Sequence, residues 1–119
     1  MRFKEGVVIF DLHPRVRDAM YVVDEVCRKT MNLEAVITSV SEGTHSENSR
    51  HYARRRLPDE QDGLQGSLAF DLRTIAYFKT FGLLQKKQIQ TYRDELAKAL
   101  GEDFDVVLES NHIHVELDP

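Results

Sequence analysis

Apolar residues recur at helical spacing along two stretches of the chain. The first stretch predicts a helix over residues 14–30, with Pro14 at the first helical position and the region of Asn32 as its end. Its apolar stripe consists of Val16, Ala19, Met20, Val22, Val23, Val26 and Cys27. The second stretch predicts a helix over residues 84–100, which ends at Gly101. Its apolar residues in register are Ile89, Tyr92, Leu96 and Leu100.

Four further segments alternate between apolar and polar residues, as strands with one buried face do. They cover residues 34–40, 68–73, 105–109 and 112–117. Only Ser110-Asn111 separates the last two, and a two-residue connection of this kind predicts a β-hairpin. Together these elements predict an α+β fold: a small antiparallel sheet with the helices packed on one face.

Length and charge narrow the class of protein. The 119 residues, 41 % hydrophobic and 30 % charged, predict a single domain over residues 1–119. A net charge of −4 argues against nucleic-acid binding, which usually requires a basic surface. The one basic run, residues 54–56, is followed at once by acidic residues and is therefore locally of mixed charge. No segment approaches the roughly 18 apolar residues of a membrane-spanning helix, so we expect no membrane partner. We expect no signal peptide and synthesis in the cytoplasm, with the lone Cys27 as a buried thiol.

The predicted closing hairpin collects polar side chains on one face. Alternation directs Ile113, Val115 and Leu117 to the core, and it directs His112, His114 and Glu116 to the other side. In a two-residue hairpin the residues that flank the turn face each other. Glu109 is therefore expected opposite His112, and Val107 opposite His114.

Other side chains suited to metal binding lie elsewhere in the chain. Asp71 is on the polar side of the strand at residues 68–73, and His45 and His51 lie in the long polar segment at residues 41–66. Zinc binds imidazole nitrogen and carboxylate oxygen, and a catalytic zinc site needs only three protein ligands. His13, beside Pro14, is assigned to the start of the first helix and to no other role.

Three short motifs carry a resemblance to a known family. They are Ser-Arg-His-Tyr at 49–52, Ala-Phe-Asp-Leu-Arg at 69–73 and His-Ile-His-Val-Glu at 112–116. In this order they resemble the zinc D-Ala-D-Ala carboxypeptidases and L-Ala-D-Glu endopeptidases, which share a fold with the hedgehog signalling domain. The chain looks most like short phage or prophage members, which cleave peptidoglycan.

The resemblance implies a role for individual residues. One Zn²⁺ would be held by His51, Asp71 and His114, with Glu109 as general base and His112 as a second catalytic residue beside the metal. Substrate-contacting or supporting residues would be Ser49, Arg50, Arg73 and Glu116. The implied substrate is a stem or cross-link peptide of peptidoglycan, reached in the bacterial cell wall after release of the protein. The sequence does not indicate an oligomeric state.

Several alternatives stay open. His51 and Asp71 are separated by more residues than in the family, so residues 54–66 are interpreted as a surface insertion, and His45 is an alternative first ligand. His112 and Glu109 form a competing pair of ligand and base. The protein could also be a non-catalytic zinc-binding interaction module of the same fold, or an interaction protein without metal.

Overall fold

The computed structural model describes residues 1–9, 12–40, 66–74 and 85–119. Over these residues it is an α+β structure with two helices and a five-stranded sheet. The helices are α1 (Pro14–Met31) and α3 (Gln85–Leu100). The strands are β1 (Arg2–Phe3), β2 (Val36–Ser39), β3 (Ala69–Arg73), β4 (Phe104–Leu108) and β5 (His112–Leu117). Both predicted helices and all four predicted strands are confirmed, with ends that shift by one or two residues.

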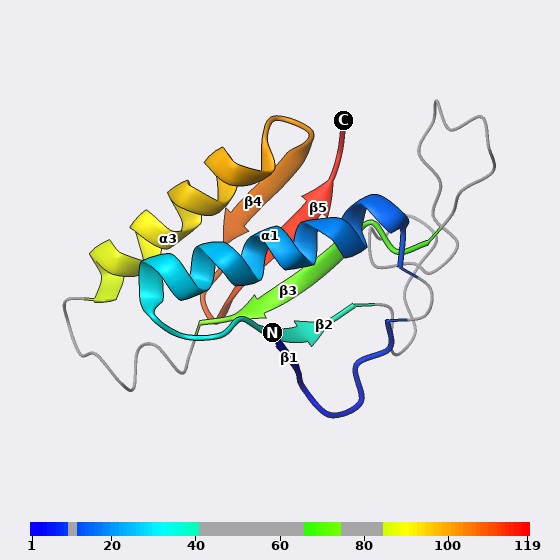
Figure 1. The fold of residues 1–119 in the computed structure, drawn as a ribbon, viewed down its shortest axis with the longest axis horizontal. Coiled ribbons are helices and arrows are strands. Elements are labelled where there is room, and N and C mark those ends of the chain that lie inside the picture. The colour runs from blue at the N-terminus through cyan, green and yellow to red at the C-terminus, as the bar shows by residue number, and fades with distance from the viewer. Residues whose placement is uncertain (10–11, 41–65, 75–84) are drawn as a thin grey trace.

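The sheet has the strand order β1-β2-β3-β5-β4, and both helices cover the same face of it (Figure 1). The predicted antiparallel sheet is correct for three of its four strand pairs. The expectation fails at the N-terminal strand, because β1 pairs with β2 in parallel and makes the sheet mixed. This pairing joins Arg2 to Val36 and Phe3 to Ile37.

The ends of the helices follow from local chemistry. His13 is the N-cap of α1: its Nδ1 accepts the backbone N–H of Arg15 at 3.2 Å, one of the donors that a helix start leaves unpaired. At the other end Asn32 adopts a left-handed conformation with φ 56°, which stops the helix. Gly101, with φ 85°, does the same after α3. The sequence-based assignments of these three residues are confirmed.

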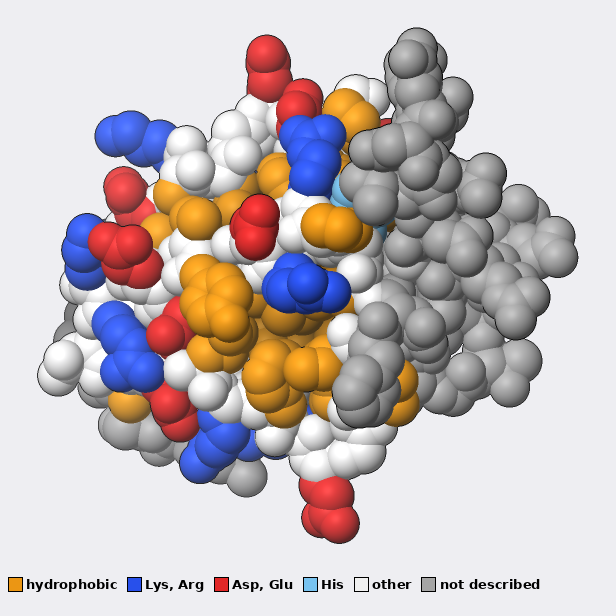
Figure 2. Space-filling view, turned by 45° about the vertical axis from the view of Figure 1, so that its right-hand side comes forward, with side chains coloured by type: hydrophobic (Ala, Val, Ile, Leu, Met, Phe, Trp, Pro, Cys, Tyr) orange, Lys and Arg blue, Asp and Glu red, His pale blue; other side chains and the backbone are white. Residues whose placement is uncertain are grey.

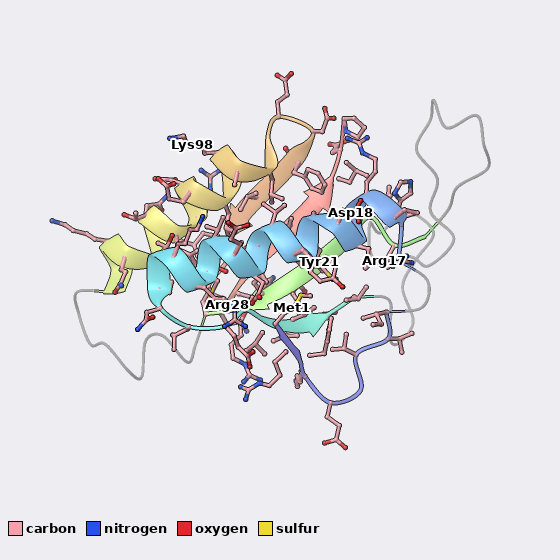
Figure 3. All side chains as sticks on the ribbon, viewed as in Figure 1. Met1, Arg17, Asp18, Tyr21, Arg28 and Lys98 are labelled. Carbon is pink, nitrogen blue, oxygen red and sulfur yellow. The ribbon has the colours of Figure 1, made fainter. Side chains whose placement is uncertain are left out.

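The core lies between the sheet and the two helices. Val16, Met20, Val23 and Cys27 of α1 are all buried, so the single thiol is a core residue as expected. The face of the sheet that is turned toward the helices supplies further core residues: Ile37, Phe70, Leu72, Val106, Ile113, Val115 and Leu117. Arg17, Asp18 and Tyr21 are exposed on the side of α1 turned toward the viewer in Figure 3.

Some apolar surface stays open to solvent. Figure 2 shows hydrophobic side chains gathered between charged ones on one face of the molecule. Among the described residues the exposed large hydrophobic side chains are Ile9, Tyr21, Val22 and Val107. Isolated exposed apolar residues are normal on protein surfaces, and this face carries no assignment of function.

Candidate metal and catalytic site

The side chains expected to carry the chemistry meet on the face of the sheet that the helices do not cover. Along β5, the buried residues Ile113, Val115 and Leu117 alternate with the half-buried His112, His114 and Glu116. The strand β3 alternates in the same way, which turns Asp71 and Arg73 away from the core. The predicted division of β5 into an apolar and a polar face is therefore confirmed.

The register of β3 and β5 sets which of these residues are neighbours. Asp71 is the cross-strand partner of His114, and Arg73 is the partner of His112. A register shift between Ile37 and Ser39 of β2 brings Ser39 opposite Asp71, and the hydroxyl of Thr38 donates to the Asp71 carbonyl at 3.4 Å. Such irregularities bend a strand locally and redirect side chains. Asp71 is thus held between two strands.

The imidazole of His114 lies between two carboxylates. Its Nδ1 is 2.9 Å from Oδ1 of Asp71, and its Nε2 is 3.1 Å from Oε1 of Glu116. The three side chains are 20 %, 17 % and 21 % exposed, so they are mostly withdrawn from water. A carboxylate oxygen can only accept, and both ring nitrogens therefore face acceptors.

These contacts change the proton affinity of His114. The hydrogen bond with Asp71 raises the pKa of the imidazole above its usual 6.5, while partial burial opposes the shift and Glu116 adds to it. The charged ring is favoured because a negative group lies at each nitrogen. A divalent cation at Nδ1 would replace one proton and find the same negative surroundings.

His112 lies at the edge of the same group. Its Nε2 is 3.8 Å from Oδ1 of Asp71, and its Nδ1 is 2.6 Å from Oδ1 of Asn111. An amide oxygen accepts, so Nδ1 donates to it and, in the neutral ring, Nε2 keeps its lone pair. This role of Asn111 was not predicted from the sequence. Its place directly before the histidine was the available signal, because a short amide side chain can reach a neighbouring ring.

The predicted hairpin pairing is confirmed. The N–H of Glu109 donates to the carbonyl of His112 at 2.8 Å, and Val107 is the cross-strand partner of His114. The Glu109 side chain is exposed, directly after the end of β4. It lies on the same face as His112, because cross-strand partners share a face. Its role as a base stays a prediction.

The remaining predicted site residues belong to the segment at residues 41–65. Ser49, Arg50 and His51, and the alternative ligand His45, lie outside the described residues. The same is true of nearly all of the predicted insertion at 54–66, of which only Gly66 is described. Of the three expected zinc ligands, the described part of the chain therefore brings together Asp71 and His114.

A group of three acidic residues adjoins the site and was not expected from the sequence. Asp105, Glu116 and Asp118 bring one carboxylate oxygen each to within 4.8 Å of one another. Asp105 is the cross-strand partner of Glu116, so the hairpin register was the signal that could have revealed the group. Exposed acidic groups often occur without a metal, and the cluster alone assigns no site.

Among the described residues, neither helix combines the length and apolar character needed to cross a membrane.

Comparisons with known proteins add no relative. No protein-family model matches the chain, and no curated protein and no solved structure matches it either.

Proposed function

We propose that this protein is a zinc-dependent peptidase that cleaves stem or cross-link peptides of bacterial peptidoglycan, of the D-Ala-D-Ala carboxypeptidase or L-Ala-D-Glu endopeptidase type. The observation that supports the proposal most is the 2.9 Å approach of Asp71 Oδ1 to His114 Nδ1. Separate motifs of the sequence indicate these two residues as zinc ligands. Their convergence on one sheet face is what such a site requires.

The donor set fits zinc. An imidazole nitrogen and a carboxylate oxygen are both ordinary zinc ligands, and a catalytic site completes its protein set with one more. In the proposal His51 is that third ligand. The half-buried setting of Asp71 and His114 also suits a cation, because partial removal of water strengthens the attraction between the carboxylate and a bound ion.

The reaction is the addition of water to a peptide bond. Bound zinc would supply a water of lowered pKa and would polarise the scissile carbonyl. Glu109 would take a proton from the attacking water and pass it to the leaving nitrogen as the C–N bond breaks, so that a carboxylic acid and an amine are released. Arg73 is the partner of His112 across β3 and β5, and its guanidinium would stabilise negative charge that develops on the carbonyl oxygen.

The test combines metal analysis with peptide cleavage. Purified protein supplied with zinc is incubated with one wall peptide that ends in D-Ala-D-Ala and another that contains L-Ala-D-Glu, and the products are identified by mass spectrometry. We expect one zinc per chain and cleavage of one of the two bonds. Glu109→Gln should keep the zinc and lose about 10²–10⁴-fold in kcat. The control, Glu102→Gln, makes the same charge change on an exposed side chain in the turn before β4 and should leave kcat unchanged.

Two results would overturn the proposal in different ways. If zinc binds and neither peptide is cleaved, the protein is a zinc-binding interaction module rather than a peptidase. If zinc does not bind in stoichiometric amount, both of these functions are rejected.

A further inference from the structure

Glu116 makes a contact that zinc ligation alone does not explain. It lies two positions after His114 in β5, on the same face, and its Oε1 is 3.1 Å from Nε2 of the ring. The opposite nitrogen, Nδ1, is the one that faces Asp71. The two nitrogens of His114 are therefore directed to different carboxylates, one on its own strand and one on β3.

We infer that Glu116 is a positioning residue that holds Nε2–H of His114 and so makes Nδ1 the nitrogen that binds the metal together with Asp71. The inference rests on the proposed function. A metal-binding imidazole must be neutral, with one nitrogen protonated and the other free to donate its lone pair. A carboxylate that accepts the N–H fixes both the tautomer and the orientation of the ring.

Neighbouring charges favour this orientation of Glu116. Carboxylate oxygens of Asp105 and Asp118 lie within 4.8 Å of a Glu116 oxygen, and like charges at such separations repel. The N–H of the imidazole gives Glu116 a hydrogen-bond donor at 3.1 Å, which offsets part of this repulsion. The orientation of Glu116 is thereby explained without a second metal bound by the three acidic residues.

The experiment determines which nitrogen of His114 carries the metal. Protein labelled with ¹⁵N in its histidines is loaded with zinc, and long-range ¹H–¹⁵N correlation spectra are recorded for the wild type and for Glu116→Ala, Glu116→Gln and Glu102→Gln. Zinc affinity is measured in parallel by competition with a chelator. Thermal unfolding of each metal-free variant verifies that it folds.

We expect zinc on Nδ1 and a proton on Nε2 of His114 in the wild type. Glu116→Ala should weaken zinc binding by about 10–100-fold, as removal of such a partner usually does. Glu116→Gln retains an oxygen acceptor and should lose less, and Glu102→Gln should bind zinc like the wild type. The conservative variant also keeps the inference testable if Glu116→Ala does not fold.

The possible failures are distinguishable. Zinc bound through Nε2, or equal zinc affinity in the wild type, Glu116→Ala and Glu116→Gln, would overturn the role of Glu116 and leave the peptidase proposal intact. A wild-type protein that binds no zinc would overturn the proposed function, and with it this inference.

Discussion

Asp71 Oδ1 and His114 Nδ1 face each other at 2.9 Å across β3 and β5, although 43 positions separate them in the chain. In the proposed site both are zinc ligands. We expect Asp71→Asn to weaken zinc binding by more than the roughly 10–100-fold cost of losing an outer partner, because a neutral amide oxygen is a much poorer zinc ligand than a carboxylate. Zinc affinity is measured by chelator competition.

Asp18→Asn is the matched control for this change. Asp18 is exposed on α1, and the same substitution there removes one negative charge away from the site face (Figure 3). Its zinc affinity should equal that of the wild type. Equal affinity in Asp71→Asn as well would show that Asp71 is no ligand.

The raised pKa of His114 predicts a pH-dependent stability of the metal-free protein. A group whose pKa is higher in the folded state stabilises the fold below its unfolded pKa, near 6.5, and loses this contribution as the pH rises through the folded value. We therefore expect the free energy of unfolding of the wild type, relative to His114→Gln, to fall as the pH rises above the usual imidazole pKa of 6.5. Urea denaturation in the presence of a chelator measures this free energy of unfolding at each pH.

Zinc affinity should change in the opposite direction over the same range. Zinc and a proton compete for the ring nitrogen, so binding strengthens as the pH rises. If the difference in the free energy of unfolding between the metal-free wild type and His114→Gln stays constant with pH, the described contacts of His114 with its two carboxylates are contradicted.

The parts of the fold that the sequence predicts well are those with a local cause. The strict alternation from Ile113 to Leu117 leaves one possible buried face for β5, and the hairpin turn then determines the register with β4. That register places Glu109 opposite His112, as expected. The helix ends at Asn32 and Gly101 follow in the same way from residues that tolerate a left-handed backbone.

Features that depend on distant contacts were not predictable in this way. The strand β1 has only two residues, Arg2 and Phe3, and two residues show no period. Its parallel pairing with β2 is set by tertiary packing rather than by its own sequence. The contacts of His114 could be predicted only in part: alternation puts Glu116 on the correct face, but only the β3–β5 register shows that Asp71 lies at the other nitrogen.

His13 provides a prediction on the stability of α1. Its buried imidazole accepts the backbone N–H of Arg15 through Nδ1, and the backbone N–H of His13 donates to the carbonyl of Ser67 at 3.1 Å. His13→Ala removes the cap, whereas His13→Asn supplies a different side-chain acceptor. We expect the alanine variant to be less stable than the asparagine variant by about 1 kcal/mol, the usual value of an N-cap. Urea denaturation measures the difference, and equal stability would show that capping contributes nothing here.

Arg93 provides a last prediction, on the β4 edge of the sheet. Because Glu109 and His112 form a hydrogen-bonded pair, alternation along β4 turns the backbone groups of Val106 away from β5, to a side where no strand of the described residues pairs with them. The guanidinium Nε of Arg93, on α3, donates to the Val106 carbonyl at 2.9 Å. Exposed strand edges invite pairing with other chains, and an occupied carbonyl prevents part of that pairing.

Removal of this contact should have two consequences. We expect Arg93→Ala to lower the free energy of unfolding by roughly 1–2 kcal/mol, since it removes a half-buried hydrogen bond from a charged donor. We also expect stronger self-association at high protein concentration, measured by sedimentation velocity. Arg17→Ala, an exposed arginine on α1, is the control and should change neither quantity. If Arg93→Ala associates no more than Arg17→Ala does, the contact of Arg93 with Val106 does not protect the edge of β4.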